Sequence, residues 1–294
     1  MPGSESAMGR LTLERLLSWP IPEVEQRYDA RDSILYALGV GLGADPLDRN
    51  QLAFVYEEGL RALPTLPVVL GYPGFWLKDP ALGADWKRVL HGEQGLTLHR
   101  PIPPSGHVIG RTRILDAADR GPDKGLFLYQ QRDLTDAATQ ELLCSLAITS
   151  VLRGDGGIGG TGAELRRPHA VPERAPDRVV TLPTLPQAAL IYRLSGDYNP
   201  LHADPEVGAA AGYPRPILHG LCTYGVAGHA VLQACCDYDP ARLKRLDCRF
   251  TAPVFPGETI ETALWLDGPR VSFVSRVVER DLRVLGNGLA EIET

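Results

Sequence analysis

The sequence predicts an α+β fold of two repeated halves, in which an antiparallel sheet curls around a buried helix. Three observations support this prediction. Residues 217–236 are apolar or small on nearly every side, several alternating segments follow them, and a motif of the second half has a counterpart in the first. A helix of that composition must be buried almost all round. The strands that follow it supply the sheet that encloses it.

The composition is typical of a globular protein that folds without a metal or disulfides. The chain has 294 residues, enough for two domains, with 44% hydrophobic residues and a net charge of -6. No basic run longer than a pair occurs, so we expect no nucleic-acid partner. The five cysteines form no CxxC pair, which favours a reducing compartment. The most apolar stretch, LPTLPVVLGYPGFWL, is broken by proline and glycine, so we expect no membrane span.

In the first half, we expect residues 1–10 to be a flexible N-terminus and residues 11–152 to form the first repeat. The segment RDSILYALGVGLG, residues 31–43, predicts a helix that glycine ends. QLAFVYEEG, residues 51–59, predicts a strand after the Asp45-Pro46 turn. Residues 125–154 predict two strands around a polar turn.

Residues 153–178 are dense in glycine, proline and charge, which indicates a linker. Residues 179–294 then form the second repeat. Its helix contains Gly220, Gly225 and Gly228, whose missing side chains would let a sheet approach closely. The alternating segments RLDCRFTAPV, ETIETALWL and RVSFVSRVVERDLRVLGNGLAEI follow and predict antiparallel strands.

A short motif occurs in both halves. LTLHRPIPPSG, residues 96–106, resembles CRFTAPVFPGE, residues 248–258, and each lies downstream of a His-Gly pair, His91-Gly92 or His219-Gly220. In both copies an alternating strand runs into two prolines with two residues between them. This match indicates an internal duplication.

The segment YRLSGDYNPLHADP, Tyr192 to Pro205, contains the candidate chemistry of Asp197, Asn199 and His202. Such a short pattern is, taken alone, usually a surface turn or a capping pair. Here Gly196 ends the preceding helix and Asn199-Pro200 forces a turn that folds His202 back toward Asp197. A carboxylate and an imidazole that share one water can hydrate a double bond reversibly. An amide beside them can orient that water.

His219 and Gly220 begin the buried helix, and two interpretations stay open for them. One is a plain helix entry with a histidine in a polar niche. The other is that the Gly220 N–H, unpaired within the helix, faces a substrate carbonyl and stabilises an enolate oxygen. The remaining histidines have no matching carboxylate pattern and are interpreted as structural or solvated: His91, His99, His107, His169 and His229.

YRLSGDYNPLHADP followed by PRPILHGLCTYG resembles the signature of the MaoC-like dehydratases, most closely the (R)-specific enoyl-CoA hydratases called hydratase 2. YDARDSILYALGVGLG and SVLRGDGGIGG are similar to the first half of that family, so the resemblance covers nearly the whole chain. It implies a double hot-dog fold, with two long helices each wrapped by an antiparallel sheet. It also implies reversible addition of water to trans-2-enoyl-CoA, which gives (3R)-3-hydroxyacyl-CoA.

By this resemblance, Asp197 and His202 form the acid/base pair, Asn199 holds the water and the Gly220 N–H contacts the thioester oxygen. The first half lacks Asn-Pro-Leu-His after its helix, so we expect one active site per chain. That half would accommodate the acyl tail along apolar residues that could equally be plain core: Val68, Val69, Leu70, Phe75 and Trp76.

The resemblance also implies contacts to coenzyme A. The candidate residues for its phosphates, which could instead be ordinary solvated charges, are Arg215, Lys244, Arg245 and Arg249, and His219 is a further candidate for substrate binding that could instead be a plain helix-entry residue. We expect no cofactor beyond the CoA of the acyl-CoA substrate, no metal, a homodimer, and a cytoplasmic, bacterial location. Two alternatives share the fold, a thioesterase and a non-catalytic acyl-CoA-binding protein. The intact set of Asp197, Asn199, His202 and Gly220 argues against a binder, which needs no base.

Overall fold

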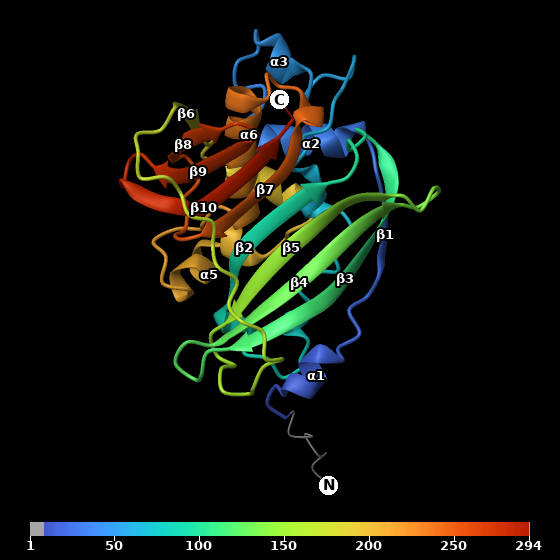
Figure 1. The fold of residues 1–294 in the computed structure, drawn as a ribbon, viewed down its shortest axis with the longest axis vertical. Helices are drawn as coiled ribbons and strands as arrows, with labels where there is room; N and C mark the ends of the chain where they lie inside the picture. Colours follow the sequence, from blue (N-terminus) through green and yellow to red (C-terminus); the bar gives the residue numbers. More distant parts are fainter. Residues whose placement is uncertain (1–8, 294) are drawn as a thin grey trace.

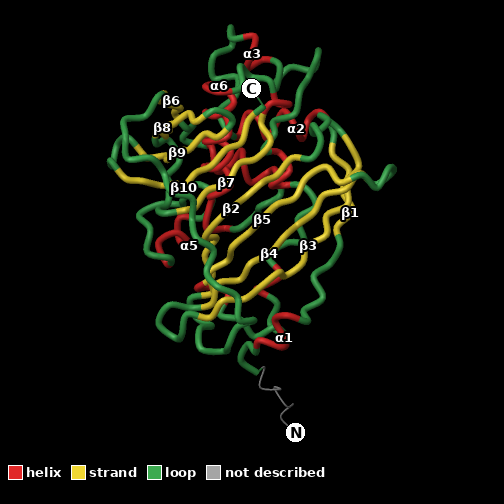
Figure 2. The backbone as a smooth tube through the Cα atoms, viewed as in Figure 1, coloured by secondary structure: helices red, strands yellow, loops and turns green. Residues whose placement is uncertain are grey.

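The computed structural model describes residues 9–293, so most of the expected flexible N-terminus, residues 1–8, lies outside the described residues. One sheet of ten strands forms the body of the protein, in the order β1-β3-β4-β5-β2-β7-β10-β9-β8-β6. Figures 1 and 2 show this sheet as one curved layer with helices behind it. Within the described residues, no helix is long and apolar enough to cross a membrane.

The first half supplies one side of the sheet. Its elements are α1 (Leu13–Leu17), β1 (Val24–Tyr28), α2 (Ala30–Gly39), α3 (Arg49–Leu52), the 3-10 turns η1 (Leu66–Val69), η2 (Trp76–Lys78) and η3 (Trp86–Arg88), and strands β2 (Val89–Leu98), β3 (Gly106–Asp119), β4 (Leu126–Asp136) and β5 (Leu142–Leu152). The predicted helix at residues 31–43 is confirmed as α2. The two strands predicted at residues 125–154 are confirmed as β4 and β5.

The second half supplies the other side in the same relative order. Its elements are β6 (Arg178–Pro183), α4 (Ala188–Tyr192), the 3-10 turns η4 (Arg193–Ser195) and η5 (Pro200–His202), α5 (Pro205–Ala210), α6 (Gly220–Cys235), η6 (Pro240–Arg242), and strands β7 (Leu243–Phe250), β8 (Thr259–Asp267), β9 (Arg270–Val277) and β10 (Leu282–Ile292). The predicted buried helix is confirmed as α6. The alternating segments after it are confirmed as β7 to β10.

The two halves meet where β2 pairs with β7 in antiparallel register. Gly95 lies directly opposite Asp247 at the middle of this pair. The shift that aligns Leu96 with Cys248 in the repeated motif also aligns Gly95 with Asp247. Each of these two residues therefore faces its own counterpart, as a two-fold axis between the repeats requires. A side chain at Gly95 would begin 2.7 Å from the carboxylate of Asp247, so glycine lets this side chain lie across the strand pair without shifting.

Helix α6 packs closely against the first half. Built onto Gly225, a Cβ atom would lie 2.6 Å from Val40, and built onto Gly228 it would lie 2.6 Å from Thr65. The glycines therefore admit the chain that follows α2 and precedes η1, rather than chiefly the sheet that the sequence led us to expect. Only at the start of the helix does the sheet make the closest approach, where Phe250 of β7 lies 3.3 Å from a Cβ placed on Gly220.

The strand predicted at residues 51–59 is wrong. The chain there forms the single helical turn α3 and then further turns. The Asp48 side chain accepts a hydrogen bond from the Asn50 N–H and so caps this turn. Phe54 is fully buried in the main core, which holds the segment without any strand partner.

The proposed equivalence of the two His-Gly pairs is also wrong. His91-Gly92 lies within β2, whereas His219-Gly220 begins α6. A register shift between His91 and Glu93 makes Gly92 the extra residue of a β-bulge. This bulge sets His91 opposite Ser150 of β5.

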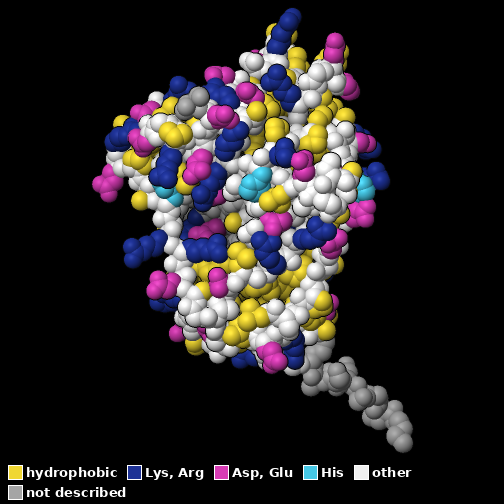
Figure 3. Space-filling view, turned by 45° about the vertical axis from the view of Figure 1, so that its right-hand side comes forward, with side chains coloured by type: hydrophobic (Ala, Val, Ile, Leu, Met, Phe, Trp, Pro, Cys, Tyr) yellow, Lys and Arg dark blue, Asp and Glu magenta, His cyan; other side chains and the backbone are white. Residues whose placement is uncertain are grey.

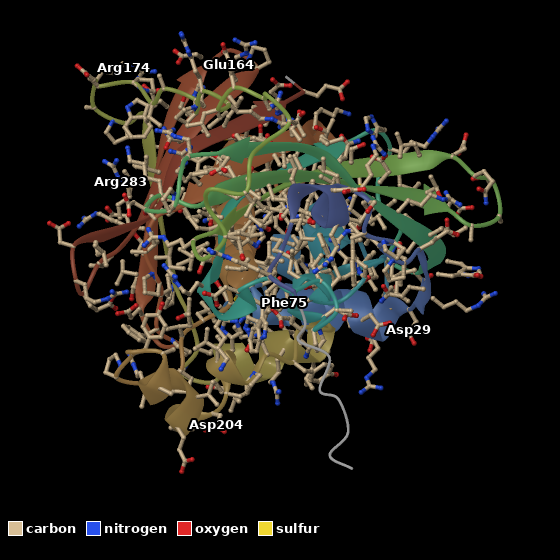
Figure 4. All side chains as sticks on the ribbon, turned by 90° about the horizontal axis from the view of Figure 1, so that it is seen from below. Asp29, Phe75, Glu164, Arg174, Asp204 and Arg283 are labelled. Atoms are coloured by element: carbon tan, nitrogen blue, oxygen red, sulfur yellow. The ribbon has the colours of Figure 1, made fainter. Side chains whose placement is uncertain are left out.

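Residues 153–177, most of the expected linker, contain no helix or strand in the structure. Their first part is fixed to the first half, because buried Asp155 accepts a hydrogen bond from the Asp85 N–H at 3.1 Å. The remainder crosses the face of the sheet opposite the helices, where Figure 4 places Glu164 and Arg174. There His169 bonds to Ser272 of β9 at 2.8 Å. This face is therefore partly covered by the linker.

Candidate active site

The segment between α4 and α5 is a chain of side-chain caps. Gly196 ends η4 with φ of 120°, a left-handed conformation that glycine adopts readily. The Asn199 N–H then donates to Asp197 Oδ1, and the Leu201 N–H donates to Asn199 Oδ1, both at 3.1 Å. Asp204 caps α5 in the same way, and Figure 4 shows it pointing away from the sheet. We call residues 196–204 the capped loop.

His202, near the end of the capped loop, is buried and held from one side. Its Nδ1–H donates to the main-chain oxygen of Ile217 at 2.9 Å. This bond leaves the Nε2 lone pair of the neutral ring free to accept a proton. Burial lowers the pKa of His202 below 6.5, although Asp197 acts in the opposite direction. The ring is therefore neutral at physiological pH and available as a base.

His219 holds both Asp197 and His202 in place. Its Nε2–H donates to the main-chain oxygen of Asp197 at 3.1 Å, and its ring stacks on that of His202 with centroids 3.8 Å apart. Burial, followed by the proximity of His202, lowers the pKa of His219 to about 4. A neutral His219 adds no positive charge beside His202. For His219 itself, the structure agrees with the first of the two interpretations, in which the histidine occupies a buried polar niche at the helix entry.

Asp197, His202 and His219 form a compact cluster. One ligand-type atom from each lies within 4.8 Å of the others. Such a cluster can share one water molecule, and the same spacing would suit a metal ion. Each imidazole already donates one N–H to a main-chain oxygen, as metal-bound histidines also do. The expectation that no metal is needed stays a prediction.

Gly220 is the first residue of α6, next in sequence to this cluster. A first-turn N–H has no partner within its helix, and the N-cap residue His219 makes no side-chain capping bond. Gly220 is exposed and lies against Phe250. The positive end of the helix dipole therefore faces the side on which His202 and Asp197 lie.

Three residues of the first half also belong to the surroundings of Asp197, and the sequence analysis missed them. The negative charge of Asp197 acts on the pKa values of Tyr72 and His91, and the charge of Arg132 acts on both as well. The His91 ring lies 4.8 Å from Phe250. No spacing rule marks these residues, because a β-bulge and the pairing of the two halves bring them to the site.

The cations expected to bind CoA phosphates are arranged differently from one another. Lys244 pairs with Glu293, Arg245 with Asp247 and Arg249 with Glu93, each at 2.6 Å. Arg215 is exposed and takes part in none of the ion pairs of the described residues; it stacks over the Phe255 ring at 5.2 Å. Arg215 is thus the candidate with a free charge. The assignment of all four to CoA stays a prediction.

On the face in Figure 3, Lys and Arg side chains are interspersed with Asp and Glu, without a continuous basic area. The expected acyl-tail residues also separate. Val68 and Leu70 are buried in the main core, and Val69 packs against it. Trp76 instead packs against a second, smaller core around Leu77 and Leu82. Phe75 is exposed by 37% and contacts Trp86 edge-on. The structure therefore does not bring these five residues together.

The fold is that of two hot-dog repeats, with the cluster of Asp197, His202 and His219 in the second. Residues 26–154 match the MFE-2 hydratase 2 N-terminal domain and residues 168–287 match the MaoC like domain. The chain therefore belongs to the MaoC-like dehydratases, within the hydratase 2 group, as the sequence predicted.

Known relatives match more than nine-tenths of the chain. It is 38% identical over 286 residues to the peroxisomal enoyl-CoA hydratase 2 of Arabidopsis thaliana, with 92% of each chain covered. A crystal structure of a MaoC-like dehydratase from Phytophthora capsici matches with a TM-score of 0.84 at 34% identity, covering 97% of this chain and 99% of that one. A Mycobacterium tuberculosis protein described as a double hotdog fold matches with a TM-score of 0.55 at 16% identity, covering 93% of each. The predicted double hot-dog fold is confirmed.

Proposed function

We propose that this protein adds water to trans-2-enoyl-CoA to give (3R)-3-hydroxyacyl-CoA, and catalyses the reverse dehydration. One observation carries the proposal: a neutral, anchored His202 and the Asp197 carboxylate lie together beside the open N-terminus of α6. Base and oxyanion site are the two elements that hydration of an enoyl thioester requires.

In the proposed mechanism, Asp197 and His202 Nε2 accept the two protons of one water as hydrogen bonds, and the Asn199 amide helps to orient it. The water oxygen bonds to C3 of the substrate while Nε2 takes one proton. The electron pair of the double bond moves through C2 to the thioester oxygen, where the Gly220 N–H stabilises the negative charge. The His202 imidazolium then returns its proton to C2. Every proton taken from water is accounted for in the product.

The lowered pKa of His202 suits this proton cycle. A buried imidazolium is a stronger acid than a solvated one, so it gives up its proton readily to C2. The nearby Asp197 stabilises the imidazolium during its short lifetime. His219 contributes by position, since it stays neutral and fixes both partners.

A direct assay tests the proposal. The purified protein is given trans-2-enoyl-CoAs of increasing chain length, loss of the enoyl-thioester absorbance is followed, and the configuration of the product is determined. We expect loss of absorbance and a 3R product. Release of free thiol with the double bond intact would instead identify a thioesterase, and tight binding without turnover would identify an acyl-CoA-binding protein.

We also propose that the protein works as a homodimer. Leu190 and Leu194, which precede the capped loop, and Tyr198 within it are each more than half exposed, and a second copy would cover such apolar side chains. Light scattering should give about twice the chain mass of 31.9 kDa. A mass equal to one chain at assay concentration would refute the dimer. The cytoplasmic, bacterial location stays a prediction.

A further inference from the structure

The inner face of β4 is unusual because two buried polar side chains interrupt its apolar residues. Alternate residues of this strand point to one side of the sheet, and Leu126, Leu128 and Leu134 are fully buried there. Between them lie Gln130 and Arg132, which are also buried, with 5% and 3% exposure. A buried guanidinium costs free energy unless a charge or several hydrogen bonds compensate it.

Arg132 lacks that compensation in the described part of the chain. Its Nη2 donates to the main-chain oxygen of Val68 at 2.7 Å, and its guanidinium lies 5.5 Å from the centre of the Tyr72 ring. It takes part in none of the ion pairs among residues 9–293, and its buried Nε has no hydrogen-bond partner there. Burial lowers the pKa of Arg132 only to about 10, so it stays protonated at neutral pH. The site therefore presents an unused donor on a guanidinium that has no ion-pair partner among the described residues.

Polar side chains continue from Arg132 toward the active site. Gln130 donates to Ser150 of β5 at 3.0 Å. Ser150 lies opposite His91 of β2, which the bulge at Gly92 aligns with it. The buried His91 Nε2 also has no partner among the described residues. We call Arg132, Gln130, Ser150 and His91 the polar strip.

The polar strip lies beside the catalytic cluster, since the charge of Asp197 acts on the pKa values of both His91 and Tyr72, and it approaches solvent at Tyr72. At His91, the ring contacts Phe250, which in turn lies against Gly220. At Arg132, the covering side chain is Tyr72, which is 43% exposed. Tyr72 lies between Gly71 and Gly74, both with positive φ. A substrate whose carbonyl meets the Gly220 N–H would thus extend its acyl chain from the cluster along the strip.

We infer that the preferred substrate carries an oxygen acceptor on its acyl chain beyond C3, a carboxylate above all, and that Arg132 binds it. This inference rests on the proposed hydration. A plain hydrocarbon tail would leave the Arg132 Nε and the His91 nitrogen unpaired in a dry site, which disfavours its binding. A carboxylate would supply both the missing charge and the missing acceptor. The substrate class is then the mono-CoA thioesters of unsaturated dicarboxylic acids.

The test compares trans-2-enoyl-CoAs of matched length that end in a methyl, a hydroxyl or a carboxylate group. For the wild-type protein, we expect kcat/KM to be at least about tenfold higher for the carboxylates at the best length, with the hydroxyl series between. Equal or lower values for the carboxylates at every length would overturn the inference while leaving hydration itself established. No hydration of any series would overturn the proposed function instead.

A variant then locates the effect. Arg132→Met should lower kcat/KM about 100-fold for the carboxylate substrate, mainly through KM, and by less than about threefold for the methyl substrate. Arg100→Met is the matched control, because Arg100 is exposed and pairs with Glu141. It should leave kcat/KM unchanged for both the carboxylate and the methyl substrate. An equal loss on both substrates in Arg132→Met would mean that Arg132 only ties β4 to Val68. The wild-type comparison decides the matter even if this variant does not fold.

Discussion

The two halves of this protein share a strand order but differ at the N-termini of their main helices. Helix α2 is closed by a capping box, in which Asp29 and Asp32 satisfy each other's main-chain N–H groups. Helix α6 has His219 as its N-cap, without any side-chain capping bond. Side chains thus stabilise the N-terminus of α2 in the first half, whereas the N-terminus of α6 in the second half stays open. Two helices of one chain thus differ in whether side chains cap their first N–H groups.

The largest effect should come from the acid/base pair. His202→Gln and Asp197→Asn should each lower kcat by about 100- to 10,000-fold, because each removes one partner of the shared water. Circular dichroism should show an unchanged fold. The matched control in the first half is His107→Gln, a half-buried histidine outside the cluster that pairs with Glu25. Rates near wild type in either active-site variant would refute the assigned roles.

The open terminus of α6 should be the next most sensitive point. In Gly220→Ala, the new Cβ would lie 3.3 Å from Phe250, so the N–H and the ring must shift apart. Since a displacement of about 1 Å in a reacting group can cost about 100-fold, we expect a loss of about 10- to 100-fold in kcat. An unchanged kcat would show that this N–H does not contact the thioester oxygen.

The closed terminus of α2 should respond in the opposite manner. Asp29→Ala removes a capping box and should lower the free energy of unfolding by about 1 kcal/mol, measured by urea titration, with kcat unchanged. If Asp29→Ala lowered kcat as strongly as Gly220→Ala, the division of roles between the two helix termini would be refuted.

Acid should weaken both activity and folding. The pKa of His202 lies below 6.5, and burial lowers those of His91, His219 and His229 to about 4. Between pH 6.5 and 4 the histidines of the unfolded chain bind protons, whereas the buried rings of the folded protein stay neutral. The contribution of these rings to the free energy of unfolding should therefore be complete above pH 6.5 and be lost as the pH falls toward 4. Activity should also fall as the pH falls, because a protonated His202 can no longer accept a proton from water. A flat stability profile from pH 7 to 4 would contradict the buried, neutral histidines.

The smallest effect should come from metal removal. Dialysis against a chelator should leave kcat unchanged, because the proposed steps use only Asp197, His202 and the Gly220 N–H. Elemental analysis of the dialysed protein is the control. Loss of activity that zinc restores would assign the cluster of Asp197, His202 and His219 to a metal.

Much of the second half could be predicted because its signals are local. The glycine-rich apolar helix, the turn at Gly196 and the alternation of β7 each follow from a few neighbouring residues. The surroundings of the cluster could not be predicted, because a β-bulge and the pairing of β2 with β7 bring His91 to the cluster. Arg132 likewise reads in sequence as one charge in a strand. Only its burial in the folded structure shows that it faces inward.

The central β2–β7 pair also determines what happens when the chain is cut. Cleavage within residues 153–177 would leave each fragment with its own strands and helix, but with β2 or β7 as an open edge. Because these edges are counterparts, each fragment could pair with the other or with a second copy of itself. The intact chain makes the correct pairing intramolecular, and therefore keeps the loop of the second half beside the polar strip of the first.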